Sequence, residues 1–145
     1  MLERELRSYE ARLRKLSRQI THADLTAAAN GAAQSLSLGS LPYGGVISGR
    51  SVVLTTYFTG GSASAATLAL GVASDVDSLM AALNVLDTTT LAIPLQGTAG
   101  VSPLGAYGGM ELLATFAPDG GHTLLALTAG SVLVEVYYSV PDAAA

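Results

Sequence analysis

The sequence predicts a mainly β protein, an antiparallel β-sandwich or jelly roll that follows one N-terminal amphipathic α-helix. Three observations predict this fold. From Leu25 onward, apolar and polar residues alternate in short runs, which is the period of a strand. Clusters rich in Gly and Pro separate these runs. Before residue 21, the apolar spacing is that of a helix. The 145 residues suit one domain of ordinary size.

Residues 1–20 are predicted to form the helix. Glu3–Arg7 and Glu10–Arg14 are favourable i,i+4 pairs, and the segment contains neither Gly nor Pro. Its apolar residues, spaced four and three apart, are Leu2, Leu6, Tyr9, Leu13, Leu16 and Ile20. A lone helix of this length is marginal in water, so this stripe must be buried. Its partner is a copy of itself, another protein or its own domain. A membrane surface or nucleic acid is less favoured, because the segment carries three Glu.

Residues 21–145 are predicted to form the sandwich domain. The strand-like runs lie at 35–38, 46–58, 67–72, 91–95, 111–117, 122–127 and 131–140. Pro94 indicates a sheet edge or a strand end. A helix of one or two turns is predicted within 75–86, capped by Asp75 or Asp77.

The last run has two distinct faces. Val132, Val134 and Val136 point to one side, whereas Leu133 and Tyr137 point to the other. Several strands of this domain are apolar or small on both sides and carry few charges, which is typical of a surface covered by protein. Leu133 and Tyr137 are therefore candidates for a subunit contact. The alternative is a strand that is covered on both sides within one sandwich.

The charge is unevenly distributed along the chain, whose formal net charge is −4. Residues 1–20 hold six of the seven Lys and Arg residues, and the remaining 125 residues hold Arg50 alone against eight Asp and Glu. Binding to nucleic-acid phosphates requires several cations, so the sandwich domain is not expected to bind nucleic acid specifically. No apolar run reaches the length of a membrane span, and charges interrupt any signal-like segment.

Residues that could carry chemistry are few. The chain has no Cys, which excludes disulfides and thiolate metal sites. His22 and His122 lack metal-ligand spacing, and His22, beside Asp24, is read as a hydrogen-bonded structural residue. Asp75 and Asp77 are read as a cap or turn in preference to a calcium site. No nucleophile elbow or phosphate loop occurs. We therefore expect no catalytic residue, no cofactor, no metal and no enzymatic activity.

Several segments carry a family resemblance across roughly residues 20–140. They are Ile20–Thr26, Leu38–Pro42 leading into Val46, Gly71–Leu79, Gln96–Val101, and Leu127–Val132 continuing to Val136–Tyr138. In these segments the chain resembles the capsid decoration (cement, or head-stabilising) proteins of tailed bacteriophages. The helix before Ile20 is not a feature of that family's core.

The resemblance implies a structural virion protein of the β-sandwich or jelly-roll type. Such a protein is made in the host bacterial cytoplasm, binds the outside of the assembled shell and stabilises it. Its implied partners are copies of itself, commonly as a trimer, and the major capsid protein. One alternative is a tail, fibre or baseplate adaptor or another head–tail structural protein. A carbohydrate-binding β-sandwich is less favoured, because the chain has no Trp and few aromatic residues.

Overall fold

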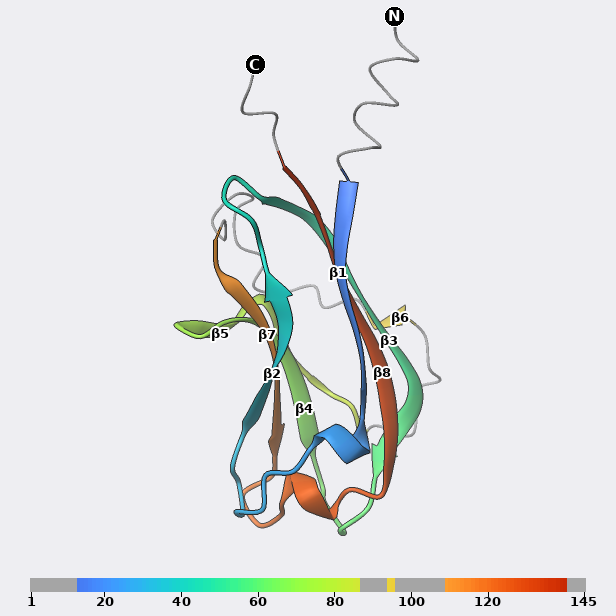
Figure 1. Ribbon diagram of the computed structural model, residues 1–145. Coiled ribbons are helices and arrows are strands. Elements are labelled where there is room, and N and C mark those ends of the chain that lie inside the picture. The colour runs from blue at the N-terminus through green and yellow to red at the C-terminus, as the bar shows by residue number, and fades with distance from the viewer. Residues whose placement is uncertain (1–12, 87–93, 96–108, 141–145) are drawn as a thin grey trace, which may run out of the picture.

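The computed structural model describes residues 13–86, 94–95 and 109–140, which form two four-stranded antiparallel sheets packed face to face (Figure 1). Sheet A has the strand order β1-β8-β3-β6, and sheet B has the order β2-β7-β4-β5. The strands are β1 (Leu13–Thr21), β2 (Gln34–Ser40), β3 (Val46–Thr59), β4 (Ala66–Val72), β5 (Asp75–Asn84), β6 (Pro94–Leu95), β7 (Glu111–Pro118) and β8 (Ala129–Ser139). Two short 3₁₀ turns, η1 (His22–Asp24) and η2 (Leu124–Ala126), complete the described elements.

The core lies between the sheets and is built from alternating strand residues. Val132, Val134 and Val136 of β8 are fully buried, as their spacing predicts. Phe58 of β3 meets Phe116 of β7 across the sandwich, with ring centroids 5.6 Å apart and ring planes tilted by 50°. Such tilted aromatic pairs add stability beyond the area they bury. The predicted mainly β fold of two packed antiparallel sheets is confirmed.

The helix predicted over residues 1–20 is wrong for residues 13–20. These residues belong to β1, which pairs with β8 along its whole length, from Leu13 opposite Ser139 to Thr21 opposite Ser131. Ile20 is fully buried in the core, and Leu16 packs against the core from the same side of the strand. Residues 1–12, which include Leu2, Leu6 and Tyr9, lie outside the described residues.

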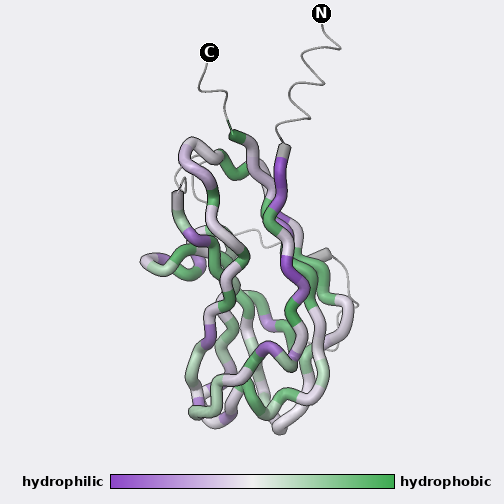
Figure 2. The backbone as a smooth tube through the Cα atoms, in the orientation of Figure 1, coloured by the Kyte–Doolittle hydropathy of each residue, from purple (hydrophilic) through white to green (hydrophobic). Residues whose placement is uncertain are grey.

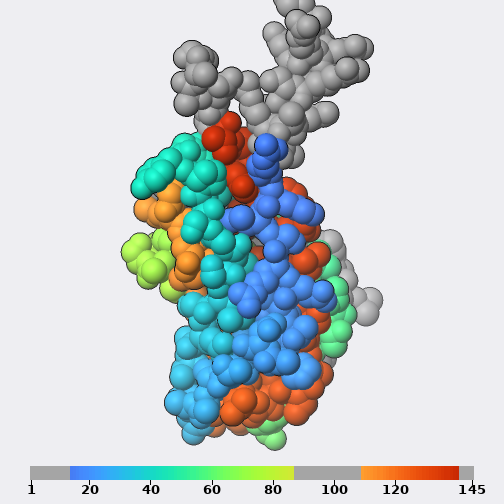
Figure 3. Space-filling view, in the orientation of Figure 1, coloured from blue at the N-terminus to red at the C-terminus, as the bar shows by residue number. Residues whose placement is uncertain are grey.

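The two edge strands β1 and β2 lie side by side along one side of the sandwich (Figures 1 and 3). Arg18 of β1 donates a hydrogen bond from Nη1 to the carbonyl oxygen of Ser37 in β2, at 2.9 Å. Close by, Leu16 lies next to Gly39, where an added Cβ would sit 3.2 Å from Leu16 Cδ2. Figure 2 shows hydrophilic residues recurring along β1, as expected for a strand at the edge of a sheet.

Two other segment predictions are wrong. The helix predicted within 75–86 is the strand β5, which forms a hairpin with β4. The strand predicted at 122–127 is instead a loop that contains η2, whose Ala126 N–H donates to Thr123 Oγ1. Pro94 lies in β6 at the edge of sheet A, in agreement with the expected edge position. No helix in the described part of the chain is long and apolar enough to cross a membrane.

Candidate interaction surfaces

The outer face of sheet A is the broad side that points away from the core. Its central strand is β8, where Leu133 lies opposite Gln19 of β1 and Val53 of β3. Tyr137 lies opposite Lys15 in the same way. Residues that oppose each other across strands share one face of a sheet, so these side chains lie together. Leu133, Tyr137 and Val53 are all half-buried, whereas their neighbours in the chain at 132, 134 and 136 are buried in the core.

The polar groups of this outer face bond to one another. Lys15 Nζ lies 2.9 Å from a carboxylate oxygen of Glu135, which leaves only 13% of the Glu135 side chain exposed. The hydrogen bond and the charge of Glu135 raise the pKa of Lys15 above its usual value. Gln19 Nε2 donates to Ser131 Oγ at 3.0 Å. The described part of this face is therefore close to neutral and holds its polar side chains in fixed positions.

The sequence-predicted contact residues have different positions in the fold. Leu133 and Tyr137 lie on the outer face of sheet A. Leu16 and Ile20 point into this chain's own core, because residues two apart in a strand share a face. Leu13 lies at the start of β1, and Leu2, Leu6 and Tyr9 are outside the described residues. The structure therefore does not bring the predicted stripe and the β8 pair together.

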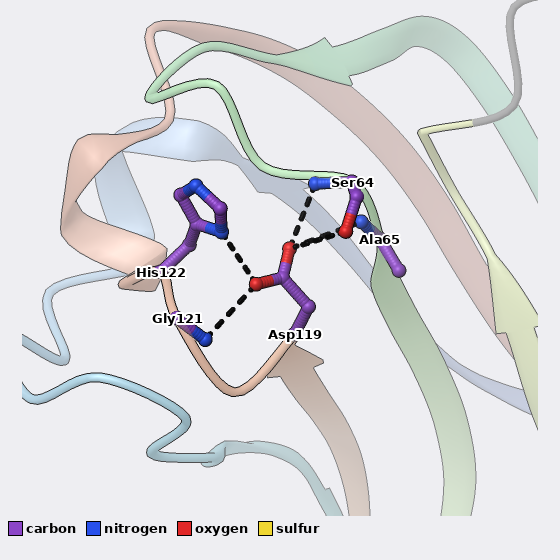
Figure 4. A network of polar contacts seen from close by, with 5 residues as sticks. All are labelled: Ser64, Ala65, Asp119, Gly121 and His122. Carbon is purple, nitrogen blue, oxygen red and sulfur yellow. Dashed lines mark hydrogen bonds and ion pairs between the residues drawn. The ribbon is translucent and has the colours of Figure 1, made fainter.

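A second polar cluster joins three loops at the far end of the sandwich, where β7 ends (Figure 4). The Asp119 carboxylate accepts hydrogen bonds from the backbone N–H and the hydroxyl of Ser64, at 2.7 and 3.0 Å. It also accepts from the Gly121 N–H at 3.1 Å, and it contacts His122 Nδ1. The carbonyl oxygen of His122 in turn accepts from the Gly31 N–H at 2.9 Å.

These donors favour the ionised form of Asp119. The contact with His122 is the largest influence, followed by the Ser64 N–H, and together they hold the pKa of Asp119 far below its usual range. In η1, Asp24 acts similarly as a structural acceptor, because its Oδ2 accepts from the Thr21 N–H at 2.9 Å. Both carboxylates therefore hold loops in place.

Asp75 and Asp77 are exposed on the β4–β5 hairpin, which projects from the body of the molecule (Figures 1 and 3). A hydrogen bond to Asp77 and the charge of that residue raise the pKa of Asp75. Within the ranges that the structure describes, no three His, Cys, Asp or Glu side chains are grouped closely enough to hold a metal ion. Asp87, the other acid considered in the sequence, lies outside those ranges.

An open groove of about 290 Å³ lies at the base of this hairpin. Its lining is mostly apolar and comes from the end of β4, the hairpin turn and the start of β7: Val72, Ala73, Ser74, Met110, Glu111 and Leu113. Met110 is 44% exposed, and its carbonyl oxygen accepts from the Leu41 N–H at 2.9 Å. We refer to this feature as the hairpin groove.

The hairpin groove and the Asp119 cluster were not predicted from the sequence. Met110 follows a Gly-rich stretch, and Asp119 sits in a Pro-Asp-Gly-Gly turn, so both were read as parts of turns. A large apolar residue inside a turn segment is the signal that could have indicated an exposed patch. The partners of Asp119 are more than fifty positions away at Ser64 and carry no sequence signal of their own.

No protein-family model matches this sequence, and no curated protein matches it. Among solved structures, a chain of the capsid asymmetric unit of cyanophage Pam1 has a similar fold, with a TM-score of 0.61 and 18% sequence identity. The alignment covers 89% of this chain and 85% of that chain. The two chains are therefore of nearly equal length and are alike from end to end. At this identity the likeness shows a shared fold alone.

Proposed function

We propose that this chain is a structural protein of a bacteriophage virion that binds the outside of the assembled capsid as an oligomer, in the form of a trimer, and stabilises the shell. One observation carries the proposal: the chain shares its fold, over most of both lengths, with a chain of a phage capsid asymmetric unit. The segments that resemble phage decoration proteins support it independently, because they were identified from the sequence alone.

The outer face of sheet A is the surface we assign to the shell contact. It is broad and close to neutral, and its half-buried Leu133, Val53 and Tyr137 lie in neighbouring register positions. Interface centres are depleted in charge and enriched in aromatic side chains, and Tyr137 suits such a centre. The internal pairing of Lys15 with Glu135 means that docking leaves no charge of this pair without its partner.

Stabilisation follows from where the protein binds. A ligand that binds the assembled lattice and not the free subunits shifts the equilibrium toward the lattice by mass action. A contact at the junction of neighbouring capsid subunits has this property, because the junction does not exist before assembly. The role requires a contact surface and no reaction, so we propose that the protein is not an enzyme.

The experiment uses purified mature heads that lack this protein, mixed with the full-length chain and sedimented. We expect the wild-type chain to sediment with the heads and to raise the temperature at which they release DNA. In solution, light scattering should give about three times the chain mass of 14.6 kDa. Leu133→Lys should weaken head binding at least tenfold, because it places a charge at the centre of the contact.

The matched control is Leu125→Lys. Leu125 is 54% exposed in η2, at the other end of the molecule, and receives the same substitution. Its variant should bind heads like the wild type, and thermal unfolding should show that both variants fold. Failure of the wild-type chain to bind heads would overturn the proposed function. Equal binding by the two Lys variants would overturn the assignment of the face.

A further inference from the structure

Exposed apolar side chains gather around the hairpin groove. Four large apolar residues in the described part of the chain are strongly exposed, namely Tyr43, Val76, Met110 and Leu125. Met110 lines the groove, and Val76 lies two residues beyond Ser74, which also lines it. The Tyr43 ring lies beside Gly109, where an added Cβ would sit 2.9 Å from Tyr43 Cε1, so Tyr43 adjoins Met110. Clustered exposed apolar residues mark interaction sites, whereas single ones are ordinary.

The charges around the groove are all negative. Glu111 belongs to the lining, and Asp75 and Asp77 are exposed on the adjoining hairpin. Residues 51–145 contain no Lys or Arg at all. The raised pKa of Asp75 agrees with this picture, because the two neighbouring carboxyl groups repel each other when both are ionised. A suitable occupant therefore brings apolar side chains together with cations.

We propose that the hairpin groove binds the segment of residues 6–12 of a second copy of this chain. This segment precedes β1 and supplies apolar Leu6 and Tyr9 together with Arg7 and Arg12. Residues 1–18 hold six of the chain's seven cations, so no other part of the chain combines these two properties. Seven extended residues reach at most about 25 Å, which is enough to place Tyr9 in the groove and an Arg beside the hairpin acids.

The topology favours a second copy over the same chain. β1 is an edge strand that lies beside β2, at one edge of sheet B, whereas the groove adjoins β5, at the opposite edge of that sheet. A segment that enters β1 must cross the sandwich to reach its own groove, but it extends directly toward a neighbouring molecule. A contact between two different surfaces is heterologous, and repeated around a closed ring it generates a cyclic oligomer. The inference thus rests on the proposed function for the oligomer, but not for capsid binding.

The test is a charge exchange in the full-length chain. The groove variant carries Glu111→Lys and Asp77→Lys, and the segment variant carries Arg7→Glu and Arg12→Glu. Each variant alone should self-associate at least tenfold more weakly than the wild type in sedimentation equilibrium, because like charges then face each other. An equimolar mixture should associate again, since each reversed surface meets its complement on the other variant.

The control for the groove variant introduces two lysines elsewhere, as Ala28→Lys and Ala33→Lys, at exposed positions of the loop that joins η1 to β2. We expect it to associate like the wild type. Normal association of the groove variant, or no recovery in the mixture, would overturn the inference. A segment variant that loses thermal stability at unchanged mass would show that the segment binds its own chain, which also overturns it.

Head binding, measured separately, keeps this inference distinct from the proposed function. A groove variant that remains oligomeric but no longer binds heads would assign the groove to the shell and overturn the inference. A wild-type chain that associates through the groove without binding heads would support the inference and overturn the proposed function.

Discussion

Gly130 of β8 packs directly against the aromatic ring of Phe58 in β3. Gly130 has a φ of +143°, and an added Cβ would lie 2.8 Å from Phe58 Cε1 and closer still to other ring atoms. Phe58 in turn packs against Phe116 of the opposite sheet. The start of β8, and with it the position of Leu133, therefore depends on a residue without a side chain.

Gly130→Ala should lower the free energy of unfolding by more than about 2 kcal/mol. The methyl group both overpacks a filled core and strains a backbone conformation that L-residues rarely adopt. Urea unfolding monitored by circular dichroism measures the effect. Gly49→Ala in β3 is the matched control, because an added Cβ there meets no atom within 4 Å. A difference smaller than about 1 kcal/mol between the two variants would show that the core yields easily around Phe58.

The Asp119 cluster should make stability depend on acid. The pKa of Asp119 is depressed in the folded chain, whereas the same carboxyl in the unfolded chain titrates near pH 3.9, about the usual value. Below about pH 5 the unfolded chain therefore binds more protons, and the free energy of unfolding falls as the pH decreases. Above that pH both states are ionised, and the contribution of Asp119 is constant.

Asp119→Asn should unfold several degrees below the wild type at pH 7, because an amide replaces the charged acceptor of the loop bonds. It should also lose less stability than the wild type between pH 5 and pH 2. Thermal unfolding over this range gives both results. Glu111→Gln makes the same chemical change at an exposed carboxylate and serves as the control. An unaltered acid dependence in Asp119→Asn would contradict the role of the cluster in folding.

The misassignment of residues 13–20 has a physical explanation. Leu16 and Ile20 are four residues apart, a spacing that places them on one face both in a helix and in a strand. Arg18, between them, favoured the helix, because in a strand it must point toward the core. It does so, and its guanidinium reaches the carbonyl oxygen of Ser37 at the open edge of the sandwich. Only the tertiary pairing with β8 distinguishes the two structures.

Prediction succeeded where the alternation was long and one-sided. Val132 to Val136 fixed the inner face of β8, and Leu133 and Tyr137 were placed on the outer face as expected. It failed for β5, where pairing with β4 decides the structure and the ladder contains bulges. The hairpin groove could not be predicted, because Ser74 and Met110 lie far apart in the sequence and come together only when β4 pairs with β7.

The central claim, that the chain coats the outside of a phage head, is tested most directly by locating it on intact virions. Antibodies raised against the folded chain and coupled to gold can be imaged on whole particles by electron microscopy. We expect label spread over the entire head surface, in many copies per particle. Label confined to the tail or to a single vertex, or absent from the particle, would contradict the claim and favour an adaptor or a function outside the virion.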